Sequence, residues 1–228
     1  MPDHAVVPST APGGHDGEVK LSGDVFGALI NLSGRRRFTS QRVVLYAVLA
    51  SLGHEGAVGT ARDTLAAFRD AHITLVEGKR GLPGIFCGQL HDAYFGTLQG
   101  DKVIRDFIQL AETTLDAIVG DVRGAPLLLD ELVRTATPLL SVLNGLTLVY
   151  EEQSKRHAQL QRKQMQGMMG DIKTIAKQAR MVAFNAQIVA ARAGQVGKEF
   201  AVVASVMTNI TGEIDELVQN ALAGSVAY

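Results

Sequence analysis

The chain has 228 residues, of which 46% are hydrophobic and 20% charged, as in an ordinary globular protein of one or two domains. Its net charge of −1 excludes a general electrostatic attraction to nucleic acid or to anionic lipid. Its single cysteine, Cys87, excludes a disulfide framework within one chain and fits a reducing compartment.

The beginning of the chain carries no targeting signal. Residues 1–20 lack the basic start and apolar stretch of a secretion signal and are predicted to form a disordered tail. The longest apolar run, residues 43–53, has about half the length that a bilayer span requires. We therefore expect a cytoplasmic protein without a membrane segment.

The remainder, from residue 21 to residue 223, is predicted to be helical throughout, because it shows no sustained period-two alternation. Breaks are expected at residues 54–56, 78–84, 100–101 and 124–126, which gives four helices before residue 126. The stretch that follows is interrupted only by Pro138, which is expected to open or kink a helix. We expect one long helix from Thr137 to Arg192.

Two segments of this region carry a resemblance. Residues 30–42, INLSGRRRFTSQR, resemble a motif of PilJ-type sensor domains and the related P-box of nitrate and nitrite sensor kinases. Residues 136–154, ATPLLSVLNGLTLVYEEQS, resemble the closing helix of the same domain. The resemblance implies a four-helix-bundle sensor domain over residues 21–157 that dimerises through its first helix. Some members of that family bind nitrate or nitrite with an arginine of the motif, which by position is Arg37.

Periodicity gives the arginine motif a separate reason to bind an anion. It places Arg37 on one helical face with Ile30, Gly34, Gln41 and Val44. An arginine on an apolar seam is costly unless an anion or a carboxylate satisfies it. Arg37, with Arg36 and Gln41, is therefore the candidate ligand-binding set for a small anion. Arg37 can instead pair with an acidic residue or point to water, and Arg36 shares a face with Leu29 and Val43, which leaves the seam assignment open.

A metal site and a catalytic site are both weakly indicated. Cys87 and His91 are four residues apart on a predicted helix, and with His72 they could ligate zinc. A thiol in the core beside a surface histidine explains the pair more simply, so we predict no metal and no cofactor. Without a phosphate loop, paired acids or a Ser/His/Asp arrangement, no enzymatic activity is predicted. The RRR run lacks aromatic or further basic neighbours and is not predicted to bind nucleic acid.

The last third of the chain has the strongest apolar pattern. Two seams alternate in steps of three and four residues: Met165, Met168, Ile172, Ile175, Ala179, Val182, Ala186 and Val189, then Phe200, Val203, Met207, Ile210, Ile214, Leu217 and Ala221. Joined by the link at residues 194–197, they predict an antiparallel coiled-coil hairpin over residues 158–228. Pairing of two hairpins into a four-helix homodimer would complete its core.

A second apolar stripe runs beside the first seam. It consists of Met181, Phe184, Ile188 and Ala191, with Val202 and Val206 as a smaller counterpart on the return arm. The stripe can pack against the other arm or the dimer mate. Alternatively, it is an outward contact surface for partners near the hairpin tip.

Residues 175–214 resemble the signalling tip of methyl-accepting chemotaxis proteins, most specifically where AARAG is followed by FAVVA. The resemblance implies a dimeric hairpin that packs with neighbouring receptor dimers and docks the histidine kinase CheA and the coupling protein CheW. By position, it assigns two faces to residues of the tip. The dimer–dimer and kinase face contains Met181, Phe184, Asn185, Ile188 and Arg192, and the coupling-protein face contains Gln195 and Val202.

Four residues depart from the pattern of that family: Lys177, Arg180, Val189 and Glu199. Because they remove or reverse charges, they are expected to change which partner is accepted more than whether the fold forms. The sequence thus predicts an all-α, dimeric signal transducer that couples a helical sensor domain to a CheA/CheW array. The alternatives are a free-standing dimerisation or interaction module, and a nitrate or nitrite sensor whose output is not chemotaxis.

Overall fold

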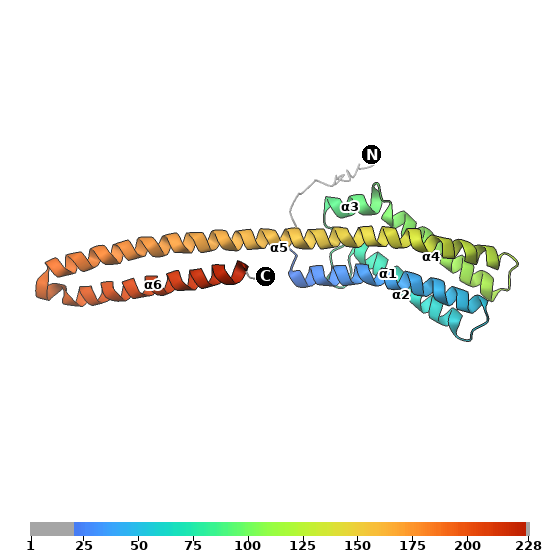
Figure 1. Cartoon of the computed structure of the whole chain (residues 1–228), viewed down its shortest axis with the longest axis horizontal. Coiled ribbons are helices and arrows are strands. Elements are labelled where there is room, and N and C mark those ends of the chain that lie inside the picture. The colour runs from blue at the N-terminus through green and yellow to red at the C-terminus, as the bar shows by residue number, and fades with distance from the viewer. Residues whose placement is uncertain (1–20, 227–228) are drawn as a thin grey trace, which may run out of the picture. The chain divides into compact units, whose positions relative to one another are not determined.

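The structure, a computed structural model, describes residues 21–226, so the predicted disordered tail at residues 1–20 lies outside the described part. The described residues are all-α and contain no strand. The elements in chain order are α1 (Gly23–Ser51), α2 (Ala57–Glu77), α3 (Gly88–Phe95), α4 (Gly100–Val119), α5 (Ala125–Arg192), the 3-10 turn η1 (Gly194–Gly197) and α6 (Lys198–Val226) (Figure 1). They divide into two compact units, unit 1 ending at Ser154 and unit 2 beginning at Lys155.

Local signals in the sequence account for the first helix boundaries. Ser22 caps α1, because its side-chain oxygen accepts a hydrogen bond from the Val25 N–H at 3.3 Å, and Asp24 lies in the first turn. The C-cap residue of α2 is Gly78, which has a φ of 82°. The predicted breaks at residues 54–56 and 78–84 fall in loops, whereas α4 already begins at Gly100.

The start of the long helix was predicted too late. α5 begins at Ala125 and runs through Pro138, so the expected start at Thr137 is wrong. Pro138 cannot donate the hydrogen bond that the Arg134 carbonyl would otherwise accept. Its side chain is exposed, so water can take the place of the missing donor without a buried polar group being left unsatisfied.

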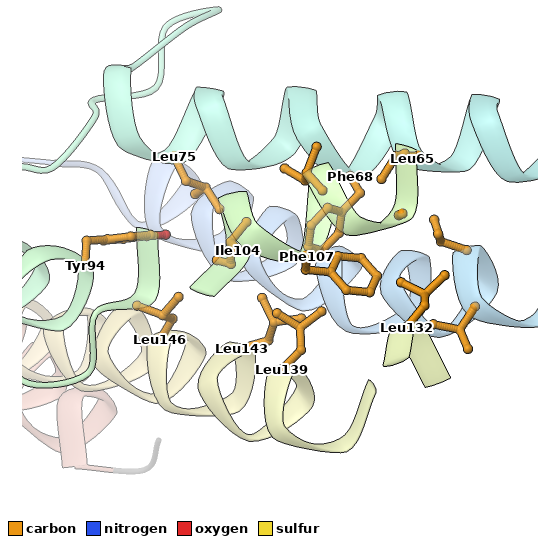
Figure 2. Close-up of a cluster of buried hydrophobic side chains, with 14 of the residues drawn as sticks. Leu65, Phe68, Leu75, Tyr94, Ile104, Phe107, Leu132, Leu139, Leu143 and Leu146 are labelled. Atoms are coloured by element: carbon orange, nitrogen blue, oxygen red, sulfur yellow. The ribbon is translucent and has the colours of Figure 1, made fainter. Parts of the chain in front are cut away.

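The core of unit 1 is formed by α1, α2, α4 and the first part of α5. Figure 2 shows the leucine and phenylalanine side chains that these helices direct toward one another. Phe68 of α2 and Phe107 of α4 meet edge to face, with ring centroids 5.5 Å apart. Burying one such large apolar side chain contributes roughly 1.5–3 kcal/mol to folding. Tyr94 of α3 is buried in the same cluster.

Two ion pairs join the antiparallel helices α2 and α4 at the surface. Arg62 contacts Asp116 at 2.7 Å, and Arg69 contacts Glu112. The later residue of α2 thus pairs with the earlier residue of α4, as expected for helices that run in opposite directions. The charged side chains bridge the two helices at the surface, and Phe68 and Phe107 pack between the same helices in the core.

One described helix, α5, contains a stretch that is long and apolar enough to cross a membrane by length and composition. In the structure, 28% of that stretch is buried. Core helices of soluble proteins pass the same test. Leu139, Leu143 and Leu146 of α5 are part of the unit 1 core.

Unit 2 is an antiparallel hairpin of the second part of α5 and α6 (Figure 1). Two glycines are required at its turn. Gly194 has a φ of 61°, and a Cβ atom on Gly197 would collide with the Ala190 carbonyl oxygen. Substituting either residue therefore strains the turn.

The two arms pack through small residues spaced seven apart. The buried positions are Ala176, Ala183 and Ala190 on α5 and Ala204, Thr211 and Val218 on α6. The predicted seams are therefore wrong about which residues close the hairpin. Ile175 is 63% exposed, and Val182 and Val189 are each 60% exposed. The apolar face of each arm is wide enough to contain two sets of residues with heptad spacing. The set with the smaller side chains is buried between the arms, because it allows the two helices to approach more closely.

Candidate functional site

A charged side chain lies at the centre of unit 1. Arg36 of α1 is fully buried, seven residues from Leu29 and from Val43, which are also fully buried. A buried guanidinium is costly unless its N–H groups find partners. Its surroundings therefore decide whether unit 1 is stable.

Arg36 contacts two other helices directly, α2 and α3, and reaches a third, α5, through Ser33. Its Nη2 donates to Ser33 Oγ at 3.1 Å, and Ser33 Oγ in turn lies 2.9 Å from Thr147 Oγ1 of α5. Its Nη1 donates to Nδ1 of His72 of α2 at 3.3 Å. Its Cζ lies 5.8 Å from the centroid of the Tyr94 ring. Arg36 Nε has no hydrogen-bond partner within the described residues.

His72 connects Arg36 to an acidic residue, because each of its ring nitrogens makes one hydrogen bond. Because Nδ1 accepts from Arg36, the neutral ring carries its proton on Nε2, which donates to Asp101 Oδ1 at 2.9 Å. Burial, and then the nearby Arg36 guanidinium, lower the pKa of His72 to about 4 against the opposing effect of Asp101. The imidazole is thus neutral near pH 7. Arg105 Nε donates to Asp101 Oδ2 at 2.8 Å, which completes the chain at the surface.

Two tyrosines extend this network. The hydroxyl groups of Tyr94 of α3 and Tyr150 of α5 lie 3.3 Å apart in the core. Burial raises the pKa of Tyr150 far above its ordinary value, so its hydroxyl stays protonated. We call the connected set the polar centre: Ser33, Arg36, His72, Tyr94, Asp101, Thr147 and Tyr150. It links all five helices that contribute to unit 1.

The three candidate anion-binding residues do not form one site: Arg36 is buried in the core, whereas Arg37 and Gln41 lie at the surface. Arg37 is exposed and donates to Asn144 Oδ1 at 3.1 Å, and Gln41 is exposed and donates to the Ala136 carbonyl at 3.4 Å. The buried seam of α1 passes through Arg36, so the placement of Arg37 on it is wrong. Anion binding at Arg37 stays a prediction that rests on the resemblance.

The candidate zinc ligands have separate roles. Both ring nitrogens of His72 are hydrogen-bonded in the polar centre. Cys87 is the residue before α3, and the exposed His91 packs on Phe95 with ring centroids 5.3 Å apart. Within residues 21–226, no group of three or more His, Cys, Asp or Glu side chains is placed to hold a metal ion.

Sequence reasoning missed His72, Asp101 and Arg105 as parts of one network. A signal was present for His72, which lies seven residues after Leu65 on the buried face of α2. A polar residue at such a position needs a buried partner. The partner itself, on α4, could not be identified from spacing alone.

The hairpin of unit 2 has an apolar flank that leaves large side chains uncovered. Its residues each precede a buried position by one: Ile175, Val182 and Val189 on α5, and Val203, Ile210 and Leu217 on α6. Consecutive residues of a helix are rotated by about 100° about its axis, so each of these residues lies to one side of the buried contact line. Because the two arms run antiparallel, the three residues on α5 and the three on α6 lie on the same side of the hairpin. All six are between 49% and 67% exposed. We call this side the aliphatic flank.

The other side of the hairpin is mixed in character. Phe184 follows the buried Ala183 and so lies about 100° away from it in the opposite sense to Val182. Phe184 is 61% exposed, and Met181 and Ile188 are 54% and 39% exposed. We call these three residues the aromatic flank. Asn185, Arg192, Gln195 and Val202, the other residues that the resemblance assigns to partner faces, are also exposed.

The four departures from the family pattern fall in different places. Arg180 pairs with Asp215 of α6 at 2.7 Å, so its charge has a partner within the hairpin. Val189 belongs to the aliphatic flank, and Glu199 lies in the first turn of α6, where a negative charge is favourable. Lys177 follows the buried Ala176 on the same side as Phe184 and is exposed. Only one of the four changes thus adds an unpaired charge beside the aromatic flank.

Comparison with known families agrees with this geometry. Residues 149–221 match the methyl-accepting chemotaxis protein (MCP) signalling domain. This segment, about a third of the chain, is thus similar to an MCP signalling domain. The match covers the second part of α5, the turn and most of α6, and therefore both flanks of the hairpin. No curated protein and no solved structure matches the chain.

The matched segment contains both the small buried residues of the hairpin and its exposed flanks. The match does not reach residues 30–42, where the sequence resembles PilJ-type sensor domains. That resemblance stays a prediction. The match is therefore confined to the hairpin and the residues of α5 directly before it.

Proposed function

We propose that this chain is a soluble, cytoplasmic, homodimeric signal transducer that couples helical unit 1 to a chemotaxis-type array of CheA and CheW. The observation that carries the proposal is the division of exposed apolar residues into two flanks on a hairpin that belongs to the MCP signalling domain. The aliphatic flank serves the second copy, and the aromatic flank serves the array. The chain acts through binding, without catalysis, a cofactor or nucleic acid.

The aliphatic flank supports dimerisation because six large aliphatic residues form two heptad lines without a charged side chain among them. Two such flanks facing each other would bury both lines in a four-helix core. The partner requires no other surface, since identical flanks are self-complementary across a two-fold axis.

The aromatic flank supports a separate contact. Phe184, Met181 and Ile188 lie among polar residues such as Asn185, which is typical of protein interfaces with an apolar centre and a polar rim. Phenylalanine and methionine are enriched in such centres. A partner docked there would leave the aliphatic flank free for the second copy.

A pair of matched substitutions tests both assignments. Val182→Glu places a charge on the aliphatic flank and should shift sedimentation velocity from dimer to monomer. Phe184→Glu carries the same change on the other side and should leave the dimer intact while abolishing co-sedimentation with CheA and CheW. The proposal fails if wild type is monomeric at micromolar concentration, or if it does not co-sediment with the kinase and coupling protein. Association with unrelated partners only would favour a free-standing interaction module.

A further inference from the structure

The outer face of unit 1 contains a groove between α2 and α4. Its volume is about 400 Å³, and its apolar lining includes Ile73 of α2 and Ile108 of α4. Arg69 and Glu112 bound it toward one end, and Arg105 lies on the α4 side. His72, the central member of the polar centre, is part of its wall. The groove thus lies directly beside the polar centre.

The charges around this groove do not cancel. The two arginines that line it are paired, Arg69 with Glu112 and Arg105 with Asp101. Arg36 does not line the groove, but it lies directly behind the neutral His72 imidazole and adds a third positive charge. The excess positive charge originates from the guanidinium of Arg36, which is fully buried and has no direct carboxylate partner within residues 21–226. A buried charge of this kind favours an anion at the nearest accessible position.

Arg105 is the residue best placed to hold that anion. Its side chain is 58% exposed, and its Nε donates to Asp101, while within the described residues its two terminal nitrogens remain directed to solvent or to a ligand. A guanidinium presents five N–H donors in a planar fork that matches a carboxylate. Arg69 is already paired with Glu112 across the groove. We propose that the groove between α2 and α4 binds a small organic carboxylate, whose charged group contacts Arg105 and whose apolar part lies on Ile73 and Ile108.

The size and lining of the groove select the ligand class. The volume is near the lower end of the range for small-molecule sites, so the groove has ample room for a small organic acid. The two isoleucines can bury the apolar part of an organic ligand, which favours its binding, whereas an inorganic anion has no apolar part to bury. A single carboxylate balances the single excess charge.

Binding at Arg105 would reach α5 through contacts that already exist. Arg105 shares Asp101 with His72, His72 bonds Arg36, and Ser33 connects Arg36 to Thr147. A ligand that competes with Asp101 for Arg105 therefore changes the chain that ends on α5. That α5 transmits the change to the MCP signalling domain rests on the proposed function; the binding itself does not.

Isothermal titration calorimetry on the full chain tests the site, with sodium butyrate as the probe. Butyramide, its uncharged counterpart, and sodium nitrate at equal ionic strength are the comparison ligands. Wild type should bind butyrate saturably and the other two at least about tenfold more weakly. No saturable butyrate binding, equal binding of butyramide, or equal binding of nitrate would each overturn the proposal.

Substitutions locate the bound carboxylate. Arg105→Gln should weaken butyrate binding roughly tenfold or more, and Arg105→Lys should fall between this variant and wild type, because it keeps the charge but loses the fork. Arg62→Gln is the matched control: it removes an arginine that bridges the same two helices through Asp116 outside the groove, and should bind as wild type. Unchanged binding by Arg105→Gln would refute the assignment. Phe184→Glu should also bind as wild type, so a failure of kinase docking and a failure of ligand binding are told apart.

Discussion

Acidification should destabilise unit 1 through a single histidine. The pKa of His72 is about 4 in the folded protein, mainly because of burial, and 6.5 is its ordinary value. Between these two pH values the unfolded chain binds the additional proton, so the free energy of unfolding decreases as the pH falls below 6.5 and this loss is complete below about pH 4. The difference of about 2.5 pH units corresponds to a total of about 3 kcal/mol, of which about 2.5 kcal/mol is lost between pH 7.5 and pH 4.5.

The comparison variant is His72→Gln, whose amide can accept from Arg36 and donate to Asp101 but does not titrate. Urea unfolding at several pH values can be followed by tyrosine fluorescence, since the chain has no tryptophan and Tyr94 and Tyr150 are buried in unit 1. Wild type should lose about 2.5 kcal/mol more than His72→Gln between pH 7.5 and pH 4.5. His91→Gln, at an exposed site, should follow wild type. Parallel losses in wild type and His72→Gln would refute the role of His72.

Three further predictions concern other parts of the molecule. Arg36→Met should raise the pKa of His72 in an NMR titration, because a neighbouring positive charge is removed; an unchanged value would contradict the contact. Gly197→Ala should lower the thermal midpoint of the hairpin, measured by circular dichroism, at a cost of roughly 1–3 kcal/mol, because the new Cβ collides with the Ala190 carbonyl. The control Gly167→Ala, in open space on α5, should instead stabilise the hairpin by roughly 0.5–1 kcal/mol. Arg180→Ala should cost less than about 1 kcal/mol in urea unfolding, since its ion pair with Asp215 is partly exposed.

The helical fold and most helix boundaries could be predicted from the sequence, because glycine clusters interrupt long apolar-periodic segments. The start of α5 could not, since proline is compatible with a helix wherever solvent replaces the lost hydrogen bond, and exposure is not visible in sequence. The seams of the hairpin were misassigned for a related reason. Ala183 and Val182 are neighbours on one wide apolar face, and three- and four-residue spacing fits either line.

The polar centre shows the limit of spacing arguments. Arg36 and Arg37 are adjacent, and the apolar residues around them allowed either to face the core. What selects Arg36 is a set of partners on other helices, His72 and Tyr94 among them, whose approach depends on the tertiary fold. The hairpin was easier to predict, because its two arms are neighbours in the sequence and pair across a short turn.

The hydrogen bond between Ser33 and Thr147 also limits how α5 can move against α1. Sliding α5 by one turn toward or away from its start would bring Leu143 or Glu151 to the place of Thr147, and neither has a hydroxyl group to meet Ser33. One axial register is therefore strongly preferred, and intermediate positions leave buried donors and acceptors unmatched. We therefore expect α1 and α5 to keep this register as long as unit 1 is folded, and axial sliding of α5 past α1 to require this buried contact to break.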